Sequence, residues 1–386
     1  MSEPGRNDDE RSTGPLSDLR VIDCATVLAG PGCARYLADF GADVIKVERP
    51  GGGDSLRRMG WDDPEHPGSD LSMWWRFVGR NKQTVTLDLK DPDDRRVMLE
   101  LCDSADVLVE NFRPGTLERL DLAPSMLLER NPRLVITRVT GFGQTGPYRD
   151  RPGFATQAEA LSGFAALNGE ADGQPLLPPI ALTDEVTALA AAFATMVAVH
   201  SGVGQEVDVN LIESMLHLMG PLVSLYGLNG ETQERLGGGI FSTVPRNTYR
   251  TADGDWVAVS SSSDSVAARV MELIGFGDDE RMATFAGRLE HRAEIDERLA
   301  EWMARRTASD ALEEFTAAGA AAAPVYDMAD IFADPHFRER EAIVEVDGIP
   351  MQNLIARLSA TPGRLRWAGR PLDADGHLRG ADESPD

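Results

Sequence analysis

The sequence predicts an α/β fold built on a mostly parallel β-sheet with helices on both faces. Short apolar strands alternate with helices along the first part of the chain, and this order requires crossover helices between parallel strands. The chain has 386 residues, enough for two domains of the usual size, and 42% of them are hydrophobic, enough to bury a sizeable core.

The first strand–helix–strand unit is expected near the N-terminus. Apolar runs predict strands at 19–23 and 43–47. Between them, the glycines and proline of 29–32 predict a turn, and a helix is expected over 33–40. Gly41 follows that helix and is suited to end it.

The same alternation continues beyond this unit. Asp91 is placed to cap a helix that has Pro92 at its first position and runs to about Asp103. A short helix is expected at 124–130. Further strands are expected at 83–89, 106–109 and 134–138.

A long helix rich in small residues follows the proline-broken segment 176–182 and runs to about Val199. Asp184 stands at its start, where aspartate is a favoured N-cap that stabilises a helix by about 0.5–2 kcal/mol. The helix-start N–H groups would also keep the carboxylate ionised, as a nucleophile requires. The residues alone leave both roles open and favour capping.

The second half of the chain predicts a smaller domain. Residues 221–244 are glycine-rich and suggest a linker, and a strand is expected at 256–260. One helix places Ile295, Leu299, Trp302 and Met303 on a single face, and another is expected from Ser309 to Gly319. We expect a disordered N-terminus at 1–14, a large domain at 15–205, a linker at 206–244, a small domain at 245–323, and a return segment with the C-terminal tail at 324–386.

Charge and composition exclude several classes of function. The net charge of −25 and the pI near 4.6 argue against binding to nucleic acid or anionic membranes. The longest run of small and apolar residues, 188–199, is too short to span a bilayer, and no signal peptide is expected. Three cysteines without metal-like spacing suggest a reduced, cytoplasmic protein.

Several polar or glycine-rich segments follow expected strands. Gly30 and Gly32 resemble part of a dinucleotide fingerprint, but Arg35 replaces the third glycine, so a nicotinamide cofactor is not expected. Arg49 suits a phosphate, although a lone arginine is more often solvated at the surface. Asn111 and Phe112 could bind and stack on a flat ligand, or belong to an ordinary loop. Residues 141–147 carry three glycines that would permit close backbone approach, or form a surface turn.

Many short segments together resemble the class III coenzyme A-transferase family, which includes formyl-CoA, carnitine-CoA and succinyl-CoA transferases and is related to the α-methylacyl-CoA racemases. The likeness runs from about residue 15 to 340. The segments that carry it are 15–23, 29–32, 37–50, 81–90, 105–115, 131–133, 141–148, 204–209, 323–325 and 333–337.

This resemblance implies an interlocked homodimer, in which each chain has a Rossmann-like large domain and a smaller α+β domain. It implies acyl-CoA and a carboxylic acid as substrates, with no tightly bound cofactor and no metal. Asp184 matches the catalytic aspartate. The positions that match coenzyme A-binding residues are Val27, Leu28, Arg49, Leu87, Leu89, Lys90, Asn111, Phe112, Arg119 and, less closely, Arg151.

The implied reaction is covalent: the aspartate attacks the donor thioester, giving a mixed anhydride and then an aspartyl-CoA thioester that an acceptor carboxylate resolves. The racemase branch is the main alternative, and a catalytically silent acyl-CoA-binding dimer is another. Racemases pair the aspartate with a histidine that follows a glycine; here Phe154 follows Gly153 and cannot carry a proton. Which segment covers the site, Gly237–Gly239 or 245–250, stays open.

Overall fold

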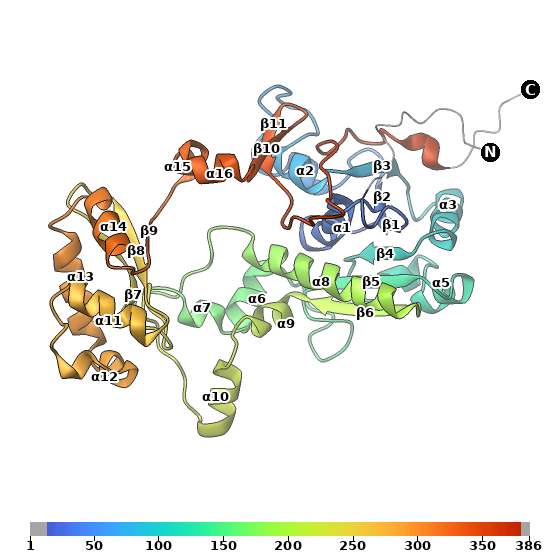
Figure 1. Ribbon diagram of the computed structural model, residues 1–386. Helices are drawn as coiled ribbons and strands as arrows, with labels where there is room; N and C mark the ends of the chain where they lie inside the picture. The colour runs from blue at the N-terminus through green and yellow to red at the C-terminus, as the bar shows by residue number, and fades with distance from the viewer. Residues whose placement is uncertain (1–13, 380–386) are drawn as a thin grey trace, which may run out of the picture. The chain divides into compact units, whose positions relative to one another are not determined.

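The computed structural model describes residues 14–379, and a parallel six-stranded sheet forms its larger part (Figure 1). The strand order is β3-β2-β1-β4-β5-β6, and every neighbouring pair is parallel. This order is usual for doubly wound α/β sheets. The strands are β1 (Arg20–Asp23), β2 (Asp43–Glu48), β3 (Lys82–Thr86), β4 (Val107–Glu110), β5 (Val135–Thr140) and β6 (Gln205–Asn210).

Helices cover both faces of this sheet, as the alternation of elements predicts. On one face, α1 (Ala29–Asp39) packs against α8 (Leu182–Ser201), which also contacts β5 and β6. On the other face, α3 (Pro92–Asp103) and α5 (Pro124–Arg130) cover apolar strand residues such as Ile22 and Leu108. Both faces of the sheet are therefore shielded from solvent, which explains why the central strands are apolar at nearly every position.

The order of the strands reverses between β1 and β4, which are neighbours in the sheet although β2 and β3 separate them in the chain. Loops that leave the carboxyl ends of two such strands diverge to opposite sides and leave a crevice between them. Here the loops are 24–28 after β1 and 111–115 after β4. The candidate site described below lies in this crevice.

Two expected boundaries in the first half differ from the structure. The helix α1 begins at Ala29 and includes the predicted turn, because Pro31 lies in the first turn, where a helix needs no backbone N–H. Gly30 is required for packing, since a Cβ there would lie 2.5 Å from that of Ala25. The strand β3 ends at Thr86, so Leu87 and Leu89 belong to the following loop.

The predicted linker 206–244 is wrong in its first part. Residues Gln205–Asn210 form β6 and pair with β5, since Val207 and Val209 alternate with polar residues as in an edge strand. Two helices follow, α9 (Leu211–His217) and α10 (Leu222–Asn229). The glycine-rich loop is therefore confined to the residues after α10.

The chain divides into two compact units. Unit 1 takes the described residues of Met1–Ser162, Pro178–Met219 and Phe337–Asp386, and unit 2 takes Gly163–Leu177 and Gly220–His336. The expected large domain at 15–205 included Gly163–Leu177, which belongs to unit 2 in the structure. Arg235 accounts for this difference, because its guanidinium donates to the carbonyl oxygens of Glu170 (3.1 Å) and Gly173 (2.7 Å).

Unit 2 contains a three-stranded antiparallel sheet, β7-β8-β9, with helices packed on it. The buried side chains Ile295, Leu299, Trp302 and Met303 all lie on α13, as their spacing predicted. The strands are β7 (Arg246–Arg250), β8 (Trp256–Ser260) and β9 (Ala322–Pro324), and the main helices are α11 (Asp264–Leu273), α13 (Arg292–Met303) and α14 (Ala308–Ala317).

The C-terminal part of the chain returns to unit 1 and protects the edge of its sheet. The Asp375 and Asp373 carboxylates accept hydrogen bonds from the backbone N–H groups of Thr84 (2.9 Å) and Thr86 (2.8 Å) on β3. Side chains thus satisfy donors that an unpaired edge strand would expose. The ends expected to be disordered lie, apart from Gly14, outside the described residues.

By length and composition, α8 could cross a membrane: its mean hydropathy is 1.5 over the most apolar window. The bent pair of α9 and α10 would pass the same test only if both helices counted as one span. One face of α8 is buried in unit 1, where the helix contacts α1, β5 and β6, and this face includes Ala188 and Ala191. Its composition is therefore weak evidence for a membrane span.

Candidate functional site

Asp184 lines a cavity of about 410 Å³ in the crevice beside β1 and β4. It lies in the first turn of α8, two residues after the helix begins at Leu182. The residue before the helix is Ala181, and no side chain caps it, so the predicted capping role of Asp184 is wrong. Asp184 therefore makes no capping hydrogen bond, and it lines the cavity.

Burial raises the pKa of Asp184 to about 6, and the nearby Glu185 and Glu159 carboxylates add to this effect. The helix-start N–H groups were expected to keep this carboxylate ionised, but the dominant effect on its pKa is desolvation, which acts in the opposite direction. The group still ionises around neutral pH. A carboxylate that is less well solvated than usual is also a more basic, more reactive nucleophile.

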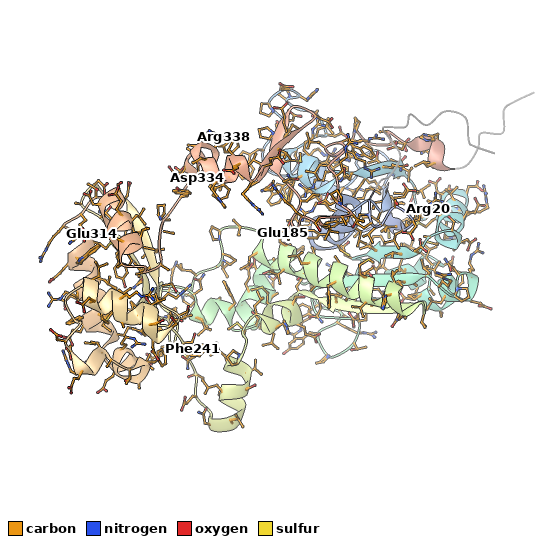
Figure 2. All side chains as sticks on the ribbon, viewed as in Figure 1. Arg20, Glu185, Phe241, Glu314, Asp334 and Arg338 are labelled. Carbon is orange, nitrogen blue, oxygen red and sulfur yellow. The ribbon has the colours of Figure 1, made fainter. Side chains whose placement is uncertain are left out.

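The two acidic neighbours of Asp184 are themselves held in place. The Glu159 carboxylate accepts a hydrogen bond from the Thr183 hydroxyl at 2.9 Å. Glu185, at the start of α8 in Figure 2, pairs with the buried Arg35 guanidinium at 2.8 Å and accepts a bond from the Tyr36 hydroxyl at 2.8 Å. These three interactions hold the start of α8, and sequence spacing gave no signal for any of them.

The loop after β1 forms another wall of the Asp184 cavity. Asn111, on the loop after β4, holds it: the Asn111 amide donates to the Thr26 carbonyl oxygen (2.6 Å) and accepts from the Thr26 N–H (2.7 Å). Asn111 is thus occupied with protein backbone, and its ligand-binding role stays a prediction. Val27 has a φ of 67°, a strained conformation for a β-branched residue, and its N–H donates to Asp54 at 3.1 Å.

A buried charge network lies beneath this loop. Lys46 contacts Asp23 (3.5 Å) and Asp54 (3.4 Å), and Lys82 contacts Asp23 at 2.8 Å; all four side chains are almost completely buried. Burial alone would raise the pKa of Asp23, but the two lysines lower it. Lys46 also donates to the Ala25 carbonyl oxygen. The network therefore fixes the backbone that carries Val27 and Leu28.

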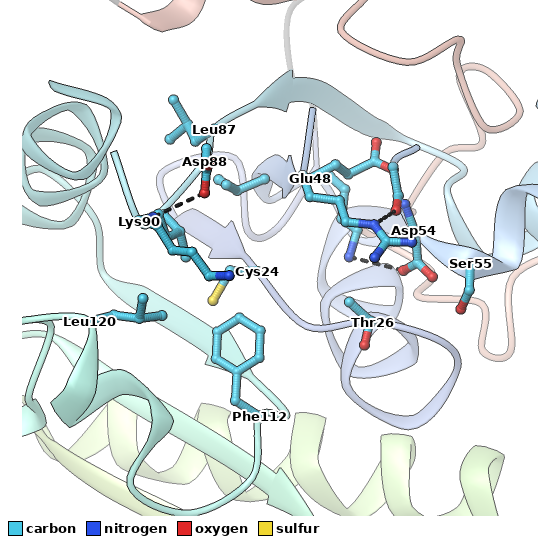
Figure 3. A pocket seen from close by; sticks show the side chains of 15 residues that line it. Cys24, Thr26, Glu48, Asp54, Ser55, Leu87, Asp88, Lys90, Phe112 and Leu120 are labelled. Carbon is cyan, nitrogen blue, oxygen red and sulfur yellow. Dashed lines mark hydrogen bonds and ion pairs between the residues drawn. The ribbon is translucent and has the colours of Figure 1, made fainter. Parts of the chain in front are cut away.

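A second cavity of about 410 Å³ adjoins the first, since Thr26 and Phe112 line both. Figure 3 shows Phe112 beside Cys24 and Lys90 on one side and Glu48 and Asp54 across from them. The Glu48 carboxylate is neutralised by Arg57 at 2.6 Å, and Asp54 by Lys46. The exposed Arg49 and Lys90 also line this cavity, together with Asp88, whose carboxylate accepts a hydrogen bond from the Lys90 backbone N–H at 3.1 Å.

The structure brings most of the predicted site residues together. The Asp184 cavity is lined by Val27, Leu28, Asn111, Phe112 and Arg151. The second cavity is lined by Arg49, Leu87, Leu89, Lys90 and Phe112. Arg119 lines neither, and its guanidinium donates to the Thr116 hydroxyl at 2.8 Å.

A third and larger cavity, of about 610 Å³, is also part of unit 1. Trp61, Trp74 and Phe77 give it an apolar, aromatic lining, and Glu185 reaches its wall but Asp184 does not. Its size alone does not make it the site of chemistry, because its arginines are already committed to Asp or Glu partners: Arg76 pairs with Asp63 at 2.8 Å.

Two features limit the chemistry of the Asp184 cavity. Phe154 lines it, and no histidine is among the described residues of its lining, so the two-base arrangement of a racemase has no second base there. Within residues 14–379, no group of three or more His, Cys, Asp or Glu side chains is placed to hold a metal ion. Asp184 is the one carboxylate among the described residues that line this cavity.

Known proteins are similar to this chain in sequence and in fold. The family described as CoA-transferase family III matches residues 16–376. Succinyl-CoA–D-citramalate CoA-transferase of Chloroflexus aurantiacus is 40% identical over 375 residues, which cover 94% of this chain and 92% of that protein. The succinyl-CoA–L-malate CoA-transferase beta subunit of Chloroflexus aurantiacus is also 40% identical, over 95% of this chain and 93% of that subunit.

Solved structures agree with the sequence comparison. A CAIB/BAIF family protein from Brucella suis superposes with a TM-score of 0.82 at 31% identity, covering 94% of this chain and 98% of that one. The matches of sequence and fold both extend along nearly the whole chain. The chain belongs to CoA-transferase family III, and it is an enzyme that transfers coenzyme A from an acyl-CoA thioester to a carboxylic acid.

Proposed function

We propose that Asp184 is the nucleophile of this transfer and forms two covalent intermediates in turn. The observation that carries the proposal is that, among the described residues, Asp184 is the only carboxylate lining its cavity. Its pKa of about 6 leaves most molecules ionised at neutral pH, while burial has removed part of the solvation that would weaken attack.

In the first half-reaction, an Asp184 oxygen attacks the thioester carbonyl carbon, and the carbon–sulfur bond breaks to release the CoA thiolate. The product is a mixed anhydride. The thiolate then attacks the Asp184 carbonyl carbon, which releases the donor as a carboxylate and leaves an aspartyl-CoA thioester. An acceptor carboxylate repeats these steps in the reverse direction, which regenerates the free Asp184 carboxylate. The thioester energy is conserved because no water takes part.

Coenzyme A would bind across both cavities. Phe112 and Thr26 separate them, so a pantetheine arm passing Phe112 would connect a nucleotide in the second cavity to a thiol near Asp184. Arg49 and Lys90 would bind phosphate, since both are exposed cations that line the second cavity. Val27, Leu28, Leu87, Leu89 and Asn111 would shape the path. We keep Arg119 only as a peripheral contact, because it lines neither cavity.

The donor we propose is succinyl-CoA, with a small dicarboxylic acid as the acceptor. Both relatives described above are named for succinyl-CoA and for dicarboxylic acids, D-citramalate and L-malate. No tightly bound cofactor is needed for this chemistry. Buried free thiols at Cys24, Cys33 and Cys102 suit a reducing compartment, and we place the enzyme in the cytoplasm.

We further propose a homodimer of interlocked chains, with a Rossmann-like large domain in each. The long helix α8 supports an assembly, because it keeps Leu189, Phe193 and Val197 on one outer face, and their exposed fractions are 39%, 72% and 55%. A large apolar surface of this kind is unusual for a monomer. Native mass spectrometry distinguishes a dimer from a monomer directly.

The test of the nucleophile uses Asp184→Ala and Asp184→Asn. Incubating the wild-type enzyme with succinyl-CoA and trapping with hydroxylamine or borohydride should modify Asp184, as peptide mass spectrometry detects. Both variants should bind CoA normally and lose transfer by about 10³-fold or more. Normal transfer by either variant would remove Asp184 from the mechanism. Solvent deuterium at the acyl α-carbon without an acceptor acid would instead favour the racemase reaction.

A further inference from the structure

The charges that line the Asp184 cavity are unbalanced. Three arginines line it, Arg113, Arg149 and Arg151, while Asp184 is the only acidic residue of its lining within the described chain. Asp150 lies outside the lining, but its exposed carboxylate pairs with the Arg149 guanidinium at 3.5 Å and balances that charge. Once Asp184 is consumed in an anhydride or a thioester, Arg113 and Arg151 remain in the lining, and no carboxylate of the described chain forms an ion pair with either.

Arg151 differs from the other two arginines because aromatic rings hold it in position. Its guanidinium carbon lies 3.6 Å from the centre of the Tyr148 ring, and Tyr148 packs edge-on against Phe142 at 5.9 Å. Stacking on a ring occupies the face of a guanidinium and leaves its N–H edge available for two parallel hydrogen bonds. In the described chain, no carboxylate forms an ion pair with Arg151.

The loop that carries Arg151 is closed on itself. Its ends meet at Gly141 and Gly153, so closely that a Cβ on Gly141 would lie 2.7 Å from the Gly153 Cα. The backbone is anchored at Gly143, whose N–H donates to the Thr140 hydroxyl at 2.9 Å, and at Gln144, whose N–H donates to Asp208 at 2.9 Å. The loop therefore presents a positioned cation on the wall that faces the nucleophile cavity.

We propose that Arg151 binds the second carboxylate of the acyl group and thereby selects dicarboxylic over monocarboxylic acids. This inference rests on the proposed attack by Asp184 in the same cavity. A thioester or anhydride carbonyl at Asp184 has no charge of its own, so a guanidinium on the cavity wall is matched only by an anionic group at the far end of the acyl chain. Arg151 is a specificity-determining residue in this account, in place of the coenzyme A contact that the family resemblance implied.

The alternative is that Arg151 binds a phosphate of coenzyme A. That role would lower affinity for every acyl-CoA and for free CoA alike. Recognition of the distal carboxylate would change only reactions of dicarboxylic acids. The two roles therefore separate in a comparison of succinate with butyrate, which has the same four carbons and lacks one carboxylate.

The experiment is degenerate exchange of ¹³C-labelled acid into its own CoA ester by the full-length enzyme, because it needs no assumption about the natural acceptor. Wild-type enzyme should exchange succinate into succinyl-CoA with a kcat/KM about 10-fold or more above that of butyrate into butyryl-CoA. Arg151→Gln should lower succinate exchange about 10- to 100-fold and butyrate exchange less than about threefold. Its Kd for free CoA should be unchanged.

Three further variants sharpen the assignment. Arg151→Lys keeps the charge but loses the paired N–H edge, and should retain part of the preference for succinate. Tyr148→Ala removes the ring beneath Arg151 and should lower succinate exchange selectively, whereas Tyr148→Phe keeps the ring and should not. Arg149→Gln removes one charge from the same loop and should change the preference by a smaller factor. An equal effect of Arg149→Gln would mean that cavity charge, and not Arg151, sets the preference.

Several results would overturn the inference. Equal losses for succinate and butyrate in Arg151→Gln would exclude carboxylate recognition, and a raised Kd for CoA would assign Arg151 to a phosphate. A wild-type enzyme that exchanges both acids equally well would also exclude it. Wild-type enzyme that binds CoA but exchanges neither acid would contradict the proposed succinyl-CoA donor and this inference with it. Normal exchange by Asp184→Ala would instead contradict the proposed nucleophile, so the two failures are distinguishable. Circular dichroism of each variant excludes loss of folding as the cause.

Discussion

Replacing Asp184 by asparagine should stabilise the fold while abolishing transfer. Burial raises the pKa of this carboxyl from 3.8 to about 6, so the folded protein holds the ionised form at a cost that the unfolded chain does not have. The cost is absent below about pH 4, where the group is protonated in both states. It grows as the pH rises from there to about 6 and is nearly constant above that.

The expected size follows from the two pKa values. The difference in pKa lowers the free energy of unfolding by about 3 kcal/mol near pH 8. Near pH 5.2 the loss is about 2 kcal/mol, because the unfolded chain is ionised there while most folded molecules are protonated. The side-chain amide introduced by Asp184→Asn has nearly the same shape as the carboxylate and no charge, so it should recover most of this energy. At roughly 2–4 °C per kcal/mol, unit 1 should melt about 6–12 °C higher near pH 8.

The assay is thermal unfolding followed by circular dichroism between about pH 5.2 and pH 8, with coenzyme A absent. Asp18→Asn is the matched control, because Asp18 is exposed on the surface of the same unit, and its melting temperature should follow the wild type. Asp184→Asn should exceed both at every pH, by a margin that narrows toward pH 5.2. Equal or lower stability near pH 8 would refute the argument that burial holds the ionised Asp184 at a cost.

Three other substitutions test the surroundings of the nucleophile. Glu159→Gln keeps an acceptor for Thr183 but removes a charge that raises the pKa of Asp184, so the acid limb of kcat/KM for succinate exchange should move below about pH 6. Asn111→Asp replaces the donor to the Thr26 carbonyl oxygen with an acceptor; it should weaken CoA binding by about 10-fold and speed hydrogen exchange in that loop, as mass spectrometry measures. Lys90→Gln should weaken CoA binding about three- to tenfold and flatten its dependence on salt, as titration calorimetry can follow.

Local sequence signals predicted much of unit 1. The Asp91 side chain caps α3 and Pro92 occupies its first position, as the residues indicated. These features depend on neighbours within a few residues, which a sequence displays directly. Such local signals do not predict the order of the strands, because that order depends on which face of the sheet each crossover connection covers. Thus the crevice between β1 and β4, where the site lies, could be placed only through the resemblance to a family.

The sequence did not predict the long-range polar contacts, because local signals do not show which distant residues meet. Asp23 and Lys82 are 59 positions apart, yet they form a buried pair at 2.8 Å. The one signal was Lys46 among the apolar residues Val44, Ile45 and Val47, where a buried charge is costly unless a carboxylate lies nearby. The pairing of Thr183 with Glu159 had no signal at all. Sequence spacing does not reveal which buried carboxylate completes a network.

The start of α8 has no side-chain cap, whereas several other helices of the chain have one, and this difference explains why capping and catalysis exclude each other at Asp184. Ser72, Asp91 and Thr307 each accept a backbone N–H at the start of a helix. The equivalent position of α8 is Ala181, which has no oxygen to offer. An aspartate acting as the cap would have its oxygens tied to N–H groups of its own helix, and bonds of that kind would lower both its pKa and its reactivity. Moving the carboxylate into the first turn gives up about 0.5–2 kcal/mol of capping and leaves Asp184 to line the cavity without a capping bond. Together with the strained Val27 and the desolvated carboxylate, this concentrates the local costs of the fold around the one group proposed to attack the thioester.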